Sequence, residues 1–196
     1  MKKIYIGIDP DLRLLNAAII SEDKKPLAVF IRRNKEGIDN TAVVGAARAS
    51  CRLVEDVIAW VVANGTDDLM EIVTIVESQN MQHALRARQT GKQKIVPDDI
   101  RRLAQVAGCL MGAFSNLSTK LVLVQAQEWK GEVPKEIHHK RIYGRLALEI
   151  ATGRIKNASP RESKLTEWSK EKINPGDFAD INDSLGLALY GAEKGF

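Results

Sequence analysis

Four carboxylates stand where folding could gather them into one site. Asp9 ends the apolar run KKIYIGID, and Glu77 ends the β-branched run EIVTIVE. Asp180 and Asp183 lie three residues apart in FADINDS, a spacing that puts two side chains on one face of a helix. Carboxylates held close together repel one another unless one takes a proton or a cation lies between them. Because oxygen-only ligands favour Mg²⁺ or Mn²⁺, the four acids predict a divalent-metal site.

Three of the four acids also have an ordinary structural explanation. An aspartate between a strand and a proline is commonly a turn residue, which would account for Asp9. Asp180 suits a helix N-cap, and Asp183 suits a first helical turn, where the helix dipole favours an acid. The metal-site hypothesis therefore depends on the elements that would bring the four together.

The first third of the chain predicts three strands and a helix. Residues 3–9, 14–20 and 27–33 are short apolar runs, and a polar turn joins the last two, so we expect an antiparallel meander. Between residues 41 and 64 apolar side chains recur every three or four positions, which predicts an amphipathic helix. The residues with this period are Val44, Ala47, Cys51, Val54, Ile58 and Val61.

The remainder alternates between helix and strand. The run 71–77 predicts a central strand and 121–125 another buried one. Helices are expected from the cap at Asp98 or Asp99 to about residue 117, and then over 137–151 and 178–191, with a mobile loop at 153–176. This order predicts an α/β domain spanning residues 1–196, with a mixed five-stranded sheet between helices. Small residues are expected on the inner face of the helix ending near 117: Ala104, Ala107, Gly108, Gly112 and Ala113.

Composition narrows the class of protein. The chain has 196 residues, 44% of them hydrophobic, which suits one domain of ordinary size. No apolar run approaches the roughly 20 residues of a membrane span, and the N-terminus lacks the form of a signal peptide, so we expect a cytoplasmic protein without membrane contact. Cys51 and Cys109 are far apart in helix-like segments, which favours two buried, reduced thiols over a disulfide or a zinc site.

The positive charge is concentrated in the middle of the chain. The protein carries a net +4, and residues 81–145 hold twelve basic and five acidic residues, so this stretch is +7 and the remainder is −3. A basic middle suits a polyanionic partner, although a solvated charged surface explains it equally well.

Three motifs carry a family resemblance. GIDPD at 7–11, IVESQN at 75–80 and DINDSLGLALYG at 180–191, in this order, resemble the RuvC Holliday-junction resolvases of the RNase H-like superfamily. The resemblance covers nearly the whole chain in element order, and the segment WKGEVPKEIHHKR makes the phage-encoded branch the most similar. One departure is Asp11, where the family pattern has glycine.

The resemblance implies an RNase H-like fold and metal-dependent hydrolysis of phosphodiesters at four-way and other branched DNA junctions. Asp9, Glu77, Asp180 and Asp183 would be the catalytic carboxylates, holding two Mg²⁺ or Mn²⁺ ions with Asp9 shared between them. Paired cuts need two sites related by a twofold axis, hence a homodimer, for which the small-residue stripe is a candidate interface; packing on its own sheet is the alternative. The expected DNA contacts are Arg86, Arg88, Lys92, Lys94, Lys130, Lys135, Lys140 and Arg141.

Other functions stay open at this point. A nuclease of the same superfamily could act on flaps or RNA–DNA hybrids. A junction-binding protein without catalysis is a second alternative, but four intact acids would bring a pure DNA binder only repulsion from phosphates. A sugar kinase or ATPase needs glycine-rich phosphate loops, and neither GIDPD nor VVGAARAS supplies one.

Overall fold

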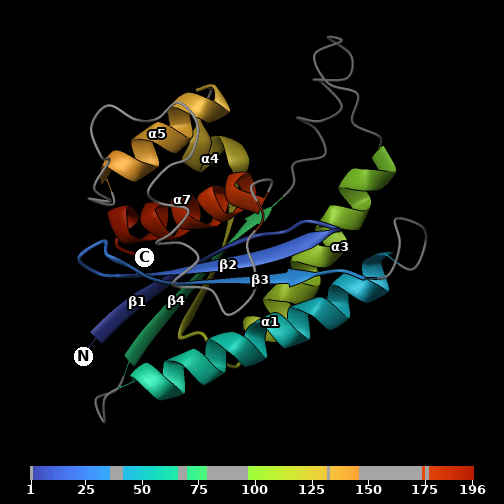
Figure 1. Ribbon diagram of the computed structural model, residues 1–196, viewed down its shortest axis with the longest axis horizontal. Helices are drawn as coiled ribbons and strands as arrows, with labels where there is room; N and C mark the ends of the chain where they lie inside the picture. Colours follow the sequence, from blue (N-terminus) through green and yellow to red (C-terminus); the bar gives the residue numbers. More distant parts are fainter. Residues whose placement is uncertain are drawn as a thin grey trace.

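The computed structural model describes residues 2–35, 42–65, 70–78, 97–131, 133–145, 174 and 177–196. A twisted sheet lies between two helical layers (Figure 1). In chain order the elements are β1 (Lys2–Asp9), β2 (Leu14–Ser21), β3 (Pro26–Arg33), α1 (Ala42–Asn64), β4 (Met70–Ser78), α3 (Pro97–Phe114), β5 (Lys120–Gln125), α4 (Ala126–Lys130), α5 (Lys135–Arg145) and α7 (Phe178–Lys194).

The sheet is mixed, as its sequence pattern predicts. Its strand order is β3-β2-β1-β4-β5, in which β1, β2 and β3 pair antiparallel while β4 runs parallel to both β1 and β5. Short turns can join only antiparallel strands, and the parallel strands follow helical crossovers. Because β1 and β4 are parallel neighbours, Asp9 and Glu77 at their carboxyl ends reach the same edge of the sheet.

Alternate residues of β1 face two different cores. Ile4, Ile6 and Ile8 pack with residues of α1 and α3, whereas Tyr5 packs with residues of α7 on the other face. Since successive side chains of a strand point to opposite faces, Asp9 lies on the α7 face with Tyr5. The helices thus cover both faces of the sheet, which confirms the expected architecture.

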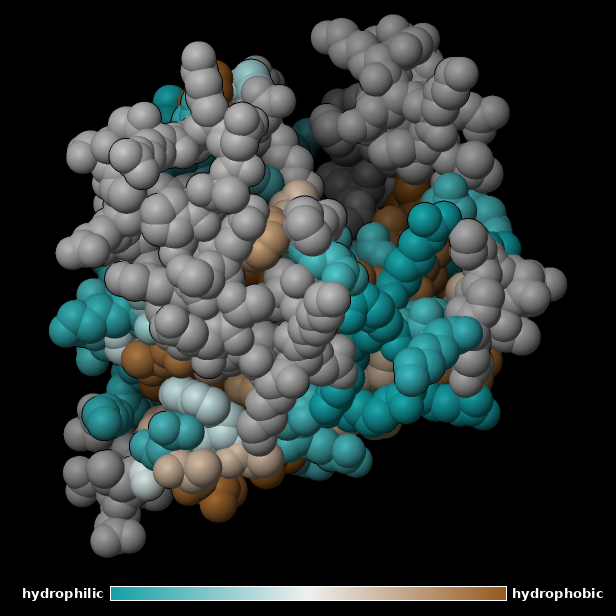
Figure 2. Space-filling model, in the orientation of Figure 1, coloured by the Kyte–Doolittle hydropathy of each residue, from teal (hydrophilic) through white to brown (hydrophobic). Residues whose placement is uncertain are grey.

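The buried face of α1 differs from the predicted one. Val44 and Ile58 are 50% and 42% exposed, Cys51 is also exposed, and the helix instead buries smaller residues such as Ala46 and Ala49. The buried face also includes Leu53 and Val57 and packs against α3 and the sheet, so it lies beside the predicted face on the same helix. Hydrophobic atoms accordingly reach the surface along the lower edge of the view in Figure 2, where α1 runs in Figure 1.

The small-residue stripe of α3 is also largely on the outside. Ala107 is buried, but Ala104, Gly108 and Gly112 are exposed, and a Cβ atom added at either glycine would meet nothing within 4 Å. The predicted inner face is therefore wrong for these three residues, and packing on the protomer's own sheet does not explain them.

The start of α3 needs a second correction. The helix begins at Pro97, so Asp98 and Asp99 occupy its first turn and do not cap it. Asp98 pairs within the helix with Arg101 at 2.7 Å and with Arg102 at 2.8 Å.

Several other expectations differ in detail. The helix expected to begin at residue 137 begins at Lys135 and is described as far as Arg145, and α4 was not predicted at all. Cys51 and Cys109 are free thiols, exposed and half-buried, so the expectation of burial is wrong. The proposed loop 153–176 falls outside the described residues apart from residue 174. Among the helices described, none has the length and apolar character needed to cross a membrane.

Candidate active site

One edge of the sheet collects the predicted acids. Asp9 is the last residue of β1 and Glu77 the next-to-last residue of the parallel strand β4, and the register pairs Ile8 with Val76 directly before them. Both acids lie at odd positions of strands whose odd residues face α7, so their side chains share one face. Glu77 is only 4% exposed. A glutamate is rarely buried to this extent unless its charge has a partner.

A glycine brings α7 against this edge. A Cβ atom on Gly7 would collide with the carbonyl oxygen of Ser184 and the backbone nitrogen of Ala188. Only glycine allows so close an approach of the helix to β1. The G of GIDPD is therefore a packing requirement that sets Asp183 and Ser184 beside the end of β1.

A buried polar link holds the end of β1. The backbone N–H of Asp9 donates to Ser184 Oγ at 3.2 Å, and Ser184 Oγ in turn donates to Asn16 on β2. Asn16 pairs with Asp9 across the two strands and is fully buried. This link joins β1, β2 and α7 directly behind the Asp9 side chain.

The start of α7 is tied to the sheet by an ion pair. Arg33 at the end of β3 donates to the carboxylate of Asp177, the N-cap residue of α7. Because Asp177 takes the N-cap position, Asp180 lies in the first turn and Asp183 in the second. The N-cap explanation considered for Asp180 and the first-turn explanation considered for Asp183 are therefore wrong.

Lys130 lies between two of the acids. Its Nζ atom is 3.0 Å from Glu77 Oε2 and 3.2 Å from Asp183 Oδ2. The neighbouring Trp129 donates its indole N–H to the same Glu77 oxygen at 3.0 Å, and the Lys130 ammonium lies 4.5 Å from the centroid of the Trp129 ring. The short helix α4 thus contributes both a cation and a hydrogen-bond donor to the acidic cluster.

Asp183 has a second partner from α5. His139 Nε2 lies 2.8 Å from Asp183 Oδ1, so each oxygen of this buried carboxylate has a nitrogen beside it. The adjacent His138 points elsewhere and packs edge-on against Trp129, with ring centroids 4.9 Å apart. The two histidines therefore have separate surroundings, as neighbouring positions on a helix require.

The electrostatics of the cluster are unbalanced. Burial raises the pKa of Asp9 well above its ordinary value, and the negative charges of Glu77, Asp183 and Asp180 raise it further, while Lys130 partly opposes them. Burial alone would lower the pKa of Lys130, but the negative charges of Glu77, Asp183 and Asp9 outweigh it and leave that pKa raised. All four predicted acids thus act on one small region, where acids outnumber cations.

The oxygen atoms of the four acids are of the type that binds a hard divalent cation, but their side chains are not arranged around a common point. Every acid offers carboxylate oxygens, the ligands that Mg²⁺ and Mn²⁺ prefer. Within the described parts of the chain, however, no group of three or more His, Cys, Asp or Glu side chains is positioned to hold a metal ion. The space between Glu77 and Asp183 holds the Lys130 ammonium.

The predicted DNA contacts divide into three groups. Lys130 lies in the acidic cluster and not on an open DNA-facing surface. Lys140 and Arg141 are exposed on α5, whereas Lys135 lies on the same helix with its side chain outside the described part of the chain. The remaining four belong to the segment 79–96, which is also outside it: Arg86, Arg88, Lys92 and Lys94.

Sequence reasoning missed several residues of the site. His139, Trp129, Asn16 and Ser184 were not predicted to contact the acids, because none has a spacing that links it to Asp9 or Glu77 in sequence. The Ser184 position held the best signal, since it directly follows Asp183 within the motif DINDS.

Asp11, the departure from the family pattern, is a turn residue. Its Oδ1 atom accepts the backbone N–H groups of Arg13 at 2.6 Å and Leu14 at 3.2 Å. This arrangement closes the connection between β1 and β2. Asp11 is therefore explained by local structure.

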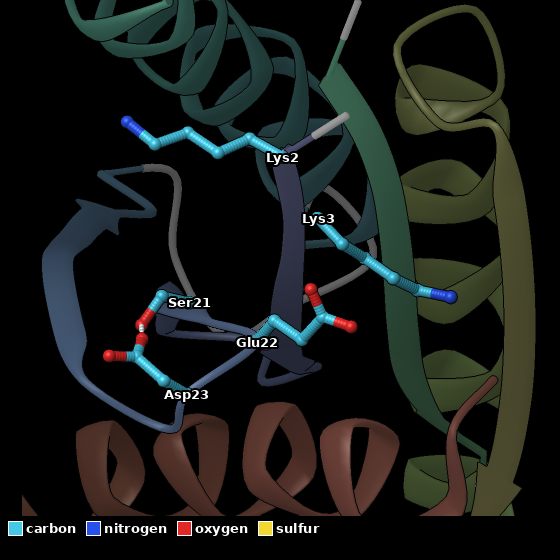
Figure 3. A pocket seen from close by; sticks show the side chains of 5 residues that line it. All are labelled: Lys2, Lys3, Ser21, Glu22 and Asp23. Atoms are coloured by element: carbon cyan, nitrogen blue, oxygen red, sulfur yellow. Dashed lines mark hydrogen bonds between the residues drawn. The ribbon is translucent and has the colours of Figure 1, made fainter.

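A pocket of about 480 Å³ lies at the opposite end of β1 (Figure 3). Two of its charged groups already have ion-pair partners, Lys3 with Glu71 at 2.9 Å and Asp23 with Lys25 at 2.6 Å. This pocket is therefore a weaker candidate than the acidic edge. Its lining residues are Lys2, Lys3, Ser21, Glu22 and Asp23.

Comparison with solved structures gives the class of the fold. The chain has the RuvC type of RNase H-like fold. Thermus thermophilus RuvC in complex with a Holliday junction substrate matches with a TM-score of 0.60 and 15% sequence identity, covering 98% of this chain and 94% of that one. A second Thermus thermophilus RuvC structure matches with a TM-score of 0.55 and 14% identity over 98% and 96% of the two chains. No protein-family model and no curated protein sequence matches the chain.

Proposed function

We propose that this protein is a divalent-metal-dependent endonuclease that cuts four-way and other branched DNA by phosphodiester hydrolysis. The observation that carries the proposal is the convergence of Asp9, Glu77 and Asp183 at one edge of a RuvC-type sheet, with Asp180 close enough to affect Asp9. A solved structure of this fold is described as a complex with a Holliday junction substrate, which supports the choice of nucleic acid.

The four acids, Asp9, Glu77, Asp180 and Asp183, would hold two Mg²⁺ or Mn²⁺ ions. When bound, these cations would activate water as a nucleophile and neutralise the charge that develops on the phosphate oxygens. The chain's own contribution is orientation. His139 holds one oxygen of Asp183, Trp129 holds Glu77, and Ser184 fixes the backbone of Asp9. Such outer contacts keep ligand side chains in a productive geometry.

DNA would approach from the side of α5 and α7. These two helices pack together, and α5 exposes Lys140 and Arg141 close to the residues that hold Asp183. Lysine and arginine contacts to phosphates provide affinity that falls steeply with salt, without reading sequence. Lys135 and the basic residues of 86–94 extend this proposed surface.

We also propose that the protein acts as a homodimer. Symmetric cuts across a junction need two sites related by a twofold axis. The outward stripe of Ala104, Gly108 and Gly112 on α3 leaves room for a second backbone, because nothing lies within 4 Å of a Cβ atom at either glycine. Light scattering of the protein with and without junction DNA tests this part of the proposal.

One observation favours a second candidate, a junction-binding protein without catalysis. The Lys130 ammonium gives Glu77 and Asp183 a shared counter-charge within the fold, so these two acids are partly compensated without a metal ion. Metal-dependent cleavage separates the two candidates.

The test compares a synthetic four-way junction, a flap and an RNA–DNA hybrid, each with Mg²⁺, Mn²⁺ or a chelator. We expect paired cuts in the junction, lost with the chelator and lowered at least about a thousandfold in Asp9→Asn, the scale of effect seen when a reacting-site group is removed. Asp11→Asn is the matched control, since it makes the same chemical change two residues away in a turn that asparagine also supports. Binding of the junction without any cleavage would favour the second candidate.

A further inference from the structure

We propose that Lys130 is a resident counter-ion that competes with divalent cations for Glu77 and Asp183. Metal binding and the Lys130 ion pairs would then exclude each other. The inference rests on the proposed metal site, but it does not depend on DNA cleavage.

The backbone of Lys130 is held in place while its side chain has a way out. Trp129, only 8% exposed, packs so tightly on α7 that a Cβ atom on Gly186 would collide with its ring. The Lys130 side chain is 24% exposed, unlike the carboxylates of Glu77 and Asp183 at 5% and 3%. Displacement therefore requires rotation of a flexible, partly solvated side chain and leaves α4 in place.

The oxygen atoms explain why the two cations exclude each other. Glu77 Oε2 accepts one N–H from Trp129 and another from Lys130, which uses both of its lone pairs. Asp183 Oδ2 faces the same ammonium. A Mg²⁺ ion would need such oxygens at about 2.1 Å, and an ammonium left about 3 Å from them would repel it.

A displaced ammonium would still be tethered at the mouth of the site. There the Lys130 ammonium would pair with a phosphate of bound DNA. The neighbouring carboxylates repel this phosphate, so the lysine would offset part of that repulsion. Because binding free energies are reciprocal, DNA that takes up the lysine would strengthen metal binding.

The first test measures Mn²⁺ affinity by titration calorimetry on the chelator-treated full chain, without DNA. Lys130→Met should bind Mn²⁺ about tenfold more tightly than the wild type, since the metal no longer has to break charge-assisted hydrogen bonds. Lys3→Met is the matched control, because it removes the same charge from an ion pair with Glu71 at the far end of β1 and should leave the affinity unchanged. Equal or weaker Mn²⁺ binding by Lys130→Met would overturn the proposal.

The second test uses the wild-type protein, so it does not depend on the variant folding. An amine-acetylating reagent is applied with increasing Mg²⁺, and peptide mass spectrometry follows each lysine. Acetylation of Lys130 should rise severalfold as Mg²⁺ saturates the site, while acetylation of Lys3 stays constant. A Lys130 rate that does not respond to Mg²⁺ contradicts the proposal. If the wild type cleaves no DNA, the proposed nuclease activity is wrong. The Mn²⁺ titration and the acetylation measurement would still decide whether Lys130 competes with metal ions.

Discussion

At its beginning, β1 carries Lys3, which pairs with Glu71 of β4, and at its end the same two strands carry Asp9 and Glu77. In the first region each charge has a partner of opposite sign and remains in contact with water, with side chains 18% and 28% exposed. In the second region buried acids share one lysine and lie under α7. Paired charges in contact with water keep one end of the sheet soluble and need no ligand. A buried excess of negative charge lowers stability and indicates that the site binds a cation.

The largest expected difference between the two ends concerns packing. Gly7→Ala should lower the free energy of unfolding by about 3 kcal/mol, because the new methyl group would force α7 away from β1. Gly108→Ala on α3 is the matched control at a protein concentration too low for the proposed dimer; within the protomer its methyl group meets nothing within 4 Å and should raise stability by about 0.5–1 kcal/mol. Urea unfolding of both variants checks this, and an unaffected Gly7→Ala would mean that α7 does not press on β1.

A smaller effect should follow from removing a partner of Asp183. His139→Ala should slow metal-dependent cleavage about tenfold, at the low end of the 10–100-fold range typical for groups that orient metal ligands. Lys25→Ala removes the partner of Asp23 at the other end of the sheet and should leave the rate unchanged. Single-turnover cleavage rates of the two variants provide the measurement. Similar decreases in rate would contradict the view that only the end of β1 with Asp9 belongs to the active site.

The smallest expected effect is a pH dependence of stability. The raised pKa of Asp9 means that the folded protein keeps a proton that the unfolded chain loses above the ordinary aspartate range. In the presence of a chelator, stability should therefore fall as pH rises from about 4 through the raised pKa of Asp9. Asp9→Asn should abolish this decline and be more stable than the wild type at pH 8.

Thermal unfolding across this pH range provides the measurement. Glu71→Gln, at the other end of the sheet, should retain the wild-type slope, because Asp9 is unchanged there. A wild-type profile with the same pH slope as that of Asp9→Asn would contradict the raised pKa of Asp9.

Much of the fold could be predicted, because the hydrophobic period that distinguishes strands from helices can be read from neighbouring residues. Strand runs ending in Asp9 and Glu77 and the helix carrying Asp183 were all found close to their observed bounds. The inner face of α1 was not, since Val44 has the hydrophobicity of a core residue, whereas the face that packs against α3 and the sheet carries Ala46, Leu53 and Val57. Which of two apolar faces is buried depends on what packs against it.

The partners of the acids could not be predicted for a related reason. Lys130 belongs to a basic stretch, and its local charge pattern suggested contact with a polyanion. Its position beside Glu77 and Asp183 arises because β5 lies next to β4 and α4 then turns back toward α7. His139 reaches Asp183 in the same way, through the packing of α5 on α7.

The amino-acid sequence by itself determined where strands and helices form and which of them end in carboxylates, because hydrophobic period and turn chemistry act between neighbours in the chain. Only the tertiary structure decided that those carboxylates lie together with Glu77 and Asp183 buried, that the absence of a side chain at Gly7 lets α7 lie against β1, and that Lys130 and His139 are partners of the acids. Burial and charge pairing depend on distances between segments up to 175 residues apart, such as Asp9 and Ser184, which no local pattern encodes.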